Sequence, residues 1–285
     1  MRMSGALSPL DVLGLPELMK RTAGHPNVTV GVLDGPVAIG HPELAEARMR
    51  ILGNGDARCT DAESHACRHG TFIAGVLFAR RDGAAPGICA ECSSLVVPIF
   101  GEHAAATPTR LAAAISAVVR AGARLINLSA GPQSLSSNTD HELEPALDFA
   151  AQHGVVVVAA AGNQGMLGSS AITRHPAVIP VVATDVSGRP LTWTNLGASA
   201  AQRGIAAPGD GITSLSPDGG AVTWSGTSVA TAMVSGALAL LWSEFPSVDA
   251  AHLRQAVTRP AHPGTLVPRL LAVQTAYASL ARHAR

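Results

Sequence analysis

Five short apolar runs alternate with segments of helical spacing along the 285 residues of the chain. The runs cover residues 28–33, 94–99, 125–129, 155–160 and 178–182. Strands that are apolar on both faces are typical of a parallel sheet buried between two layers of helices. Because parallel strands need crossover connections, the alternation predicts consecutive strand–helix–strand units.

Six segments with apolar residues at helical spacing predict the covering helices. They are residues 69–79, 108–121, 140–153, 227–243, 248–257 and 270–281. No internal repeat or break in composition divides the sequence. We therefore expect one α/β domain over residues 28–285, with a doubly wound, mostly parallel central sheet flanked by helices. Residues 1–27 are expected to form an N-terminal extension packed on this domain.

The charge balance excludes some partners. The chain has 20 Lys and Arg residues and 20 Asp and Glu residues, so its formal net charge is zero. Nucleic-acid binding requires an excess of basic side chains, so no nucleic-acid partner is expected. No apolar run reaches the ~18–20 residues of a membrane span. The N-terminus also lacks the continuous apolar core of a signal peptide. We expect a cytoplasmic protein with no membrane partner.

The cysteines permit three interpretations. Free thiols are favoured by a reducing cytosol, one or two local disulfides are the second interpretation, and a structural zinc site is the third. The Cys89–Cys92 spacing suits a zinc knuckle, whereas the Cys59–Cys67 spacing does not match a usual second pair of ligands. The sequence leaves these three open, and we assign no metal.

Serine-dependent amide hydrolysis needs a nucleophilic hydroxyl, a base, a carboxylate that orients the base, and donors for the oxyanion. Ser228 begins an apolar helix among small neighbours, although the ordinary role of a serine there is an N-cap. His69 precedes another apolar helix, and its ordinary role is that of a core or capping histidine. Asp34 ends the first apolar run, where a turn-forming Asp is common. Each position thus has an ordinary structural explanation when taken alone.

Asn163 lies in a glycine-flanked turn after the run 155–160, a position that requires no catalytic role. However, ligands of doubly wound folds bind beyond the carboxyl ends of the strands. Asp34, Ser129 and Asn163 all lie at such ends. Because each of the four candidate groups matches a different part of one mechanism, together they indicate a serine hydrolase.

The combination resembles the subtilisin-like serine proteases, in which the triad follows the order Asp, His, Ser along the chain. Residues 69–75 (HGTFIAG), 226–230 (GTSVA) and 161–163 (AGN) are similar to the histidine, serine and oxyanion-asparagine motifs of this family. The resemblance implies Asp34, His69 and Ser228 as catalytic residues and Asn163 as the oxyanion donor. It also implies that a peptide substrate binds along the backbone of Ser129, Ala130, Gly131, Ala161 and Gly162.

The residues after Asp34 depart from the family, which usually has Ser or Thr and then Gly, where this chain has Gly35-Pro36. Together with residues 67–71 (CRHGT), 98–100 (PIF) and 162–165 (GNQG), this variant resembles the branch that matures cyanobactins. Proteases of that branch cut ribosomally made precursor peptides. The resemblance implies a serine endopeptidase that cleaves such a precursor, or leader, peptide through an acyl-enzyme.

Macrocyclising members of the same branch carry an added helical segment that shields the acyl-enzyme. Only 34 residues separate Asp34 from His69, which leaves little room for such a segment, so hydrolysis is expected. Residues 80–93 are short and lack an acidic cluster, so we expect neither the calcium loop of many secreted subtilisins nor any cofactor. His175, which precedes a proline, is expected to be structural.

Several alternatives remain from the sequence. An inactive peptide-binding scaffold and a transpeptidase or macrocyclase would share the fold. A nucleotide-binding oxidoreductase is supported only by Gly162-x-x-Gly165-x-x-Gly168, which does not follow the first strand as a dinucleotide fingerprint should. A zinc-binding module would use the four cysteines. The sequence does not determine the cleavage-site specificity, the identity of the precursor peptide or the oligomeric state.

Overall fold

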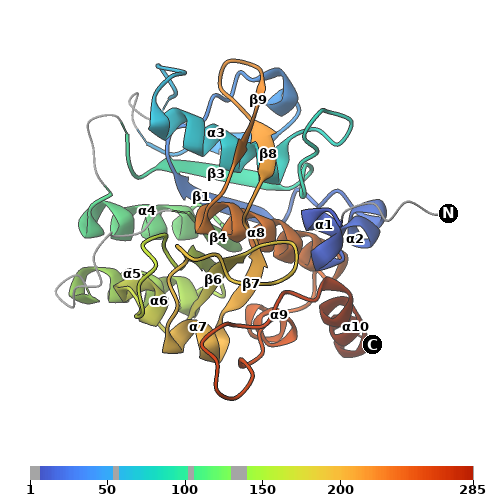
Figure 1. The fold of residues 1–285 in the computed structure, drawn as a ribbon. Coiled ribbons are helices and arrows are strands. Elements are labelled where there is room, and N and C mark those ends of the chain that lie inside the picture. Colours follow the sequence, from blue (N-terminus) through green and yellow to red (C-terminus); the bar gives the residue numbers. More distant parts are fainter. Residues whose placement is uncertain (1–6, 54–57, 102–105, 130–139, 285) are drawn as a thin grey trace.

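A seven-stranded parallel sheet forms the centre of the molecule in the computed structural model, which describes residues 7–53, 58–101, 106–129 and 140–284. The strand order is β2-β3-β1-β4-β5-β6-β7 (Figure 1). The strands are β1 Thr29–Asp34, β2 Arg48–Ile51, β3 Ser93–Pro98, β4 Leu125–Leu128, β5 Val156–Ala160, β6 Val178–Thr184 and β7 Ile205–Pro208. The expected single α/β domain with a doubly wound, mostly parallel sheet is confirmed.

Helices cover both faces of this sheet (Figure 1). On one face α3 and α8 contact the strands, and on the other face α4 and α5 do so. A short antiparallel hairpin, β8 and β9, packs against α3. The helices and the hairpin are α1 Pro9–Leu13, α2 Leu15–Arg21, α3 His65–Phe78, α4 Pro108–Arg120, α5 Asp140–Gln152, α6 Ala171–Arg174, α7 Ala198–Arg203, α8 Thr227–Glu244, α9 Ala250–Val257, α10 Val273–His283, β8 Ile212–Leu215 and β9 Ala221–Trp224.

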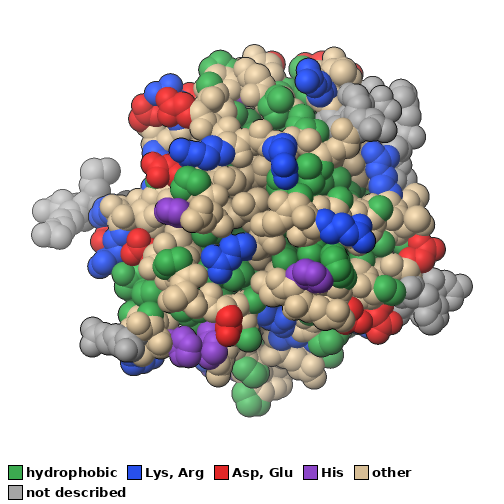
Figure 2. All heavy atoms as spheres, turned by 180° about the vertical axis from the view of Figure 1, so that it is seen from behind, with side chains coloured by type: hydrophobic (Ala, Val, Ile, Leu, Met, Phe, Trp, Pro, Cys, Tyr) green, Lys and Arg blue, Asp and Glu red, His purple; other side chains and the backbone are tan. Residues whose placement is uncertain are grey.

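The core consists of two apolar layers, one on each face of the sheet. Successive strand residues point to opposite faces, so Val156 and Val158 of β5 pack in the layer with α8, whereas Val157 packs in the layer with α4 and α5. Almost every residue of α8 is buried, which explains why this helix is apolar on all sides. Figure 2 shows Lys and Arg side chains and Asp and Glu side chains distributed over the rear face of the molecule. Among the described residues, no helix is long and apolar enough to cross a membrane.

Several elements lack the apolar runs on which our predictions rested. The edge strand β2 is Arg-Met-Arg-Ile, and it pairs with β3 alone, so half of its side chains face solvent. The extension before β1 contains α1 and α2, whose leucines enter the core layer of α8: Leu13, Leu15 and Leu18. The helix that we expected to begin at His69 begins four residues earlier, at His65, because Ser64 caps it through the backbone N–H of Cys67.

Of the three interpretations that the sequence left open for the cysteines, the structure shows a local disulfide for one pair and free thiols for the other. Cys59 and Cys67 form a disulfide, while Cys89 and Cys92 are free and buried. A zinc site that uses all four sulfurs is thereby excluded. In the part of the chain that the structure describes, no three or more His, Cys, Asp or Glu side chains are grouped to hold a metal ion. A disulfide is unusual for a cytoplasmic protein, because that compartment keeps thiols reduced.

Reducing the Cys59–Cys67 disulfide is expected to lower the free energy of unfolding by about 2–3 kcal/mol, because the unfolded chain regains the entropy of a short closed loop. For a chain of this length the melting temperature should fall by roughly 4 °C. Thermal unfolding with and without dithiothreitol measures this change. A Cys59→Ser/Cys67→Ser variant should already melt at the lower temperature and should not respond to the reductant. An equal response in this variant would contradict the prediction.

Candidate active site

The direction of chain winding reverses at β1, which pairs with β3 on one side and with β4 on the other. In open α/β sheets, a ligand site lies in the crevice beyond the carboxyl ends of the strands at such a point. Asp34 is the last residue of β1, and Ser129 directly follows β4. The candidate residues of these two strands therefore lie at the edge where the fold itself opens a site.

Three side chains from distant parts of the sequence form one hydrogen-bonded chain there. His69 Nδ1 lies 2.6 Å from Asp34 Oδ1, and His69 Nε2 lies 3.0 Å from Ser228 Oγ. Asp34 is fully buried and Ser228 is 6% exposed, whereas the His69 side chain keeps 14% of its surface exposed. A histidine placed between a buried carboxylate and a hydroxyl can take the hydroxyl proton while the carboxylate stabilises the resulting imidazolium.

The pKa of His69 reflects two opposing effects. Burial lowers the pKa because it disfavours the charged imidazolium, while the negative charge of Asp34 and its hydrogen bond raise the pKa by more. The net result is a pKa above the ordinary value of histidine. His69 therefore becomes protonated at a higher pH than a free histidine would, and a proton-accepting role for it is lost below that pH.

The structure gives a steric reason for the glycine at position 35, directly after Asp34. A Cβ at Gly35 would overlap with the carbonyl oxygen of Ala66 in the first turn of α3. The Ser or Thr that the family usually has at this position would not fit here without a shift of α3. Asp34 Oδ1 accepts a hydrogen bond from the Gly35 N–H at 2.6 Å and also contacts His69 Nδ1. Asp34 Oδ2 is buried without a hydrogen-bond partner among the described residues.

Ser228 does not cap α8, so the ordinary structural explanation for it does not apply. The helix begins at Thr227 and its N-cap is Gly226, with no side-chain cap. Asn163 supports this helix start because its Oδ1 accepts the Thr227 N–H at 2.9 Å and the Thr227 hydroxyl at 2.8 Å. The amide is thereby oriented with Nδ2 on the side of Gly226 where Ser228 Oγ also lies. This nitrogen and the first N–H groups of α8 are positioned as donors beside the hydroxyl.

Asn195 holds the loop of Asn163 in place, and no motif in the sequence indicated this role. Its Oδ1 accepts the N–H groups of Gln164 and Met166, while its Nδ2 donates to Ala161 O and to Gln164 Oε1. Gly162 adopts a φ of 106° beside the Asn195 amide, so a side chain there would be strained and would collide. The predicted peptide-binding residues Ala161 and Gly162 are thus part of one rigid loop next to Asn163.

The other predicted peptide-binding residues follow β4. Ser129 is buried, and its hydroxyl accepts a hydrogen bond from Asn127 Nδ2 at 2.6 Å. Asn127 is in turn held by the hydroxyl of Ser235 in α8. Ala130 and Gly131 lie outside the described residues. Their proposed contact with the peptide backbone therefore stays a prediction.

Aromatic rings surround His69, a feature that the sequence analysis missed. The ring of Phe100 lies 5.9 Å from that of His69, and the ring of Trp224 lies 5.7 Å from it. Trp224 also stacks on His65 and Phe72 of α3. Phe100 reaches His69 because β3 pairs with β1, which ends at Asp34, and Trp224 reaches it because the hairpin packs against α3. Both rings pack beside the imidazole, which keeps only 14% of its side-chain surface exposed.

His175, which we expected to be structural, lies outside this constellation. It ends α6 and is 7% exposed. Its Nε2 lies 3.2 Å from Asp148 Oδ1, and its Nδ1 accepts the N–H of Ala177. The glycines at 162 and 165 belong to the Asn163 loop that Asn195 holds, and they do not open a helix. The oxidoreductase alternative therefore has no support in the fold.

Comparison with known proteins agrees with the geometry. The model of the subtilase family matches residues 25–279. Subtilisin DY of Bacillus licheniformis is 30% identical over 240 residues, which cover 82% of this chain and 84% of that protein. Other relatives are longer. The chain spans only 61% of the thermostable alkaline protease of Halalkalibacterium halodurans, for example, to which it is 30% identical.

Two solved structures are more similar in sequence. A variant of the protease domain of PatA has a TM-score of 0.85 and 36% identity, and the match covers 91% of this chain and 97% of that domain. The prenylagaramide maturation protease PagA has a TM-score of 0.84 and 32% identity, with 94% and 98% of the two chains covered. With the family model matched over most of its length, the chain belongs to the subtilase family and is a subtilisin-like serine protease.

Proposed function

We propose that this protein is an endopeptidase that hydrolyses a ribosomally synthesised precursor peptide through Asp34, His69 and Ser228. The observation that carries the proposal is the continuous hydrogen-bonded chain from the buried Asp34 carboxylate through His69 to the Ser228 hydroxyl. The precursor substrate is supported by the likeness to PatA and PagA, the second of which is named a maturation protease. Membership of the subtilase family already shows a serine protease, so the proposal concerns the substrate and the residues that cleave it.

In the proposed mechanism, Ser228 Oγ attacks the carbonyl carbon of the scissile peptide bond while His69 Nε2 takes its proton. The negative charge of Asp34 stabilises the imidazolium. Asn163 Nδ2 and the Ser228 N–H donate to the oxyanion of the tetrahedral intermediate. His69 then gives its proton to the leaving amine, and an acyl-enzyme on Ser228 remains. Water, activated by His69, releases the new carboxylate and restores the hydroxyl.

The decisive experiment is mass spectrometry of the products from a precursor-like peptide. We expect linear fragments whose masses add up to that of the peptide plus one water. We also expect a fluorophosphonate probe to label Ser228. A cyclic main product would show that an amine rather than water attacks the acyl-enzyme, and would identify a macrocyclase. Absence of both cleavage and labelling would identify an inactive scaffold. Either result would refute the proposal.

Replacing Asn163 by aspartate is expected to lower kcat about 10²–10³-fold, with little change in KM. The aspartate retains Oδ1 as an acceptor for Thr227, so the start of α8 is preserved while the oxyanion donor is lost. This magnitude comes from the loss of one oxyanion donor in subtilisin, a member of the same family. Steady-state kinetics on one peptide measures it. Asn27→Ala, far from the site, is the control, and a loss expressed only in KM would argue against the oxyanion role.

A further inference from the structure

The C-terminal part of this neutral chain is strongly basic. Residues 250–285 contain five arginines and three histidines but no Asp or Glu. The loop that follows α9 contacts α7 through a hydrogen bond from the Ala261 N–H to Ala201 O, and α7 also contains no acidic residue. Asp249, the N-cap of α9, pairs with His252, but the arginines of this region still leave it with a net positive charge, which attracts anions.

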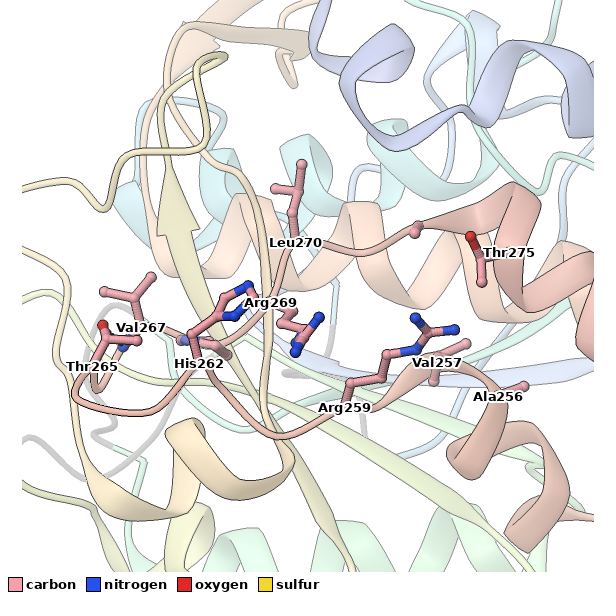
Figure 3. Close-up of a pocket in the computed structure, with 11 residues that line it drawn as sticks. Ala256, Val257, Arg259, His262, Thr265, Val267, Arg269, Leu270 and Thr275 are labelled. Carbon is pink, nitrogen blue, oxygen red and sulfur yellow. Dashed lines mark hydrogen bonds between the residues drawn. The ribbon is translucent and has the colours of Figure 1, made fainter.

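A cavity of about 440 Å³ opens in this region, between the end of α9, the start of α10 and the loop that joins them. In Figure 3 the side chains of Arg259, Arg269 and His262 line the cavity, with Arg269 between the other two. Apolar side chains form another part of the lining: Val257, Val267 and Leu270. The cavity is large enough for a small organic molecule, since ligand sites start at about 300 Å³.

The frame of this cavity is fixed by backbone hydrogen bonds. The Ala206 N–H of β7 donates to Arg269 O at 2.9 Å, and the Leu271 N–H donates to Ala206 O at 3.0 Å. The segment of Arg269 is thereby joined to the central sheet. Arg269 Nε donates to Pro260 O at 3.0 Å, which ties the two ends of the loop together. The backbone of the site is thus held in place before any ligand binds, which reduces the entropy lost on binding.

The cationic groups of the cavity have no ion pair with a carboxylate of the described residues, unlike several other arginines. Arg80 and Arg189 pair with Asp82 and Asp185. Arg254 lies on α9, and its guanidinium donates hydrogen bonds to two backbone carbonyl groups. In contrast, Arg259 has no hydrogen bond or ion pair with any described residue, and Arg269 uses only Nε. Their remaining N–H groups form the planar fork that binds carboxylate or phosphate with two hydrogen bonds.

We propose that this cavity binds a small organic anion. A carboxylate or phosphate head group contacts Arg259, Arg269 and His262, and an apolar body packs on Val257, Val267 and Leu270. The site is separate from the protease site, because none of Asp34, His69, Asn163 and Ser228 lines the cavity. The inference is independent of the substrate proposed above, and its test does not use protease activity.

Isothermal titration at low ionic strength tests the proposal with three probes: hexanoate, inorganic phosphate and hexylamine. Hexanoate carries the carboxylate on an apolar body, phosphate is the alternative head group alone, and hexylamine has the apolar body with the opposite charge. We expect saturable binding of one or both anions and none of the amine. Arg259→Ala should raise the Kd about tenfold, as expected for a lost charge-assisted pair. Arg259→Ala/Arg269→Ala should abolish binding.

Arg282→Ala is the matched control, because Arg282 lies in the same basic segment but outside the cavity lining. It should leave the Kd unchanged. Arg259 has no partner among the described residues, so its replacement should preserve the fold, which circular dichroism checks. Binding of hexanoate alone identifies a carboxylate ligand, and binding of phosphate alone identifies a phosphorylated one. No saturation by either anion, binding of hexylamine, or equal effects of Arg259→Ala and Arg282→Ala would overturn the proposal.

Discussion

The Ser228→Ala variant is expected to cleave peptides about a millionfold more slowly than the wild type, as judged by kcat. The variant lacks the only atom that can form the acyl-enzyme in the proposed mechanism, so the oxyanion donors and peptide binding are all that remain. The expected magnitude is that of the corresponding loss in subtilisin, a member of the same family. Cleavage of one precursor-like peptide, followed by mass spectrometry over long incubation, measures the rate.

Ser243→Ala is the matched control for this variant. Ser243 is a second serine of α8, and its hydroxyl donates to Ala239 O within the last turns of the helix. The same substitution there removes a hydroxyl from the same helix without touching His69. We expect this control to keep nearly full activity. A Ser228→Ala variant that retained more than about a hundredth of the wild-type rate would identify another nucleophile, since the loss of a triad serine is far larger.

Replacing Asp34 by asparagine should lower kcat about 10⁴-fold at neutral pH. The amide keeps the size of the side chain, but it removes the negative charge that stabilises the His69 imidazolium. Its NH₂ group can also face His69 Nδ1 and so favour the tautomer that cannot accept the serine proton. His69 Nδ1 lies only 2.6 Å from Asp34 Oδ1, so a change at this carboxylate acts on the imidazole through their shared hydrogen bond. Kinetics of the purified variant on the same peptide measures the loss.

The pH profile separates this electrostatic role from a packing role. In the wild type, activity should fall as the pH decreases through the His69 pKa, which lies above its ordinary value. Without the charge of Asp34, the effect that remains is burial, which lowers the pKa. The acidic limb of kcat/KM should therefore move to lower pH in Asp34→Asn. An acidic limb that stays in place would show that Asp34 does not set the protonation of His69.

Asp148→Asn provides the control for the Asp34 variant. Asp148 also contacts a histidine, His175, but the pair lies outside the proposed site and the Asp148 side chain is 57% exposed. We expect this variant to keep both its rate and its pH profile. The comparison thus tests whether the effect belongs to the Asp34–His69 pair or to any aspartate–histidine pair of the chain.

Strands with strong apolar runs and helices with clear ends were predictable, because burial on both faces requires a composition that is visible locally. The expected run 155–160 became β5, and the expected helix 227–243 became α8 with one more residue. Elements with mixed composition were missed. The edge strand β2 and the strand β9 alternate between exposed and half-buried residues, and β8 is the short and mixed Ile-Thr-Ser-Leu, so none of the three forms the apolar run by which strands are recognised.

The start of α3 shows why boundaries were harder than elements. Residues 65–68 are His, Ala, Cys and Arg, which carry little helical periodicity. Ser64 begins the helix by accepting the Cys67 N–H, and the Cys59–Cys67 disulfide ties the preceding loop to its first turn. A cap and a crosslink depend on one or two residues. The average properties of a window of sequence do not contain them.

The sequence by itself determined the chemical groups of this protein: a strand-ending Asp34, a histidine at the start of an apolar run, an asparagine turn and a serine at a helix start. It did so because each group lies in a short motif that can be recognised from the residues next to it. Only the tertiary structure decided which groups touch. His69 contacts Asp34 at 2.6 Å and Ser228 at 3.0 Å, and the rings of Phe100 and Trp224 lie beside it. These contacts, and the hydrogen bond from Asn195 to Ala161, join residues that are far apart in the chain. Such distances follow from how the sheet twists and how the helices pack, and no local pattern encodes them.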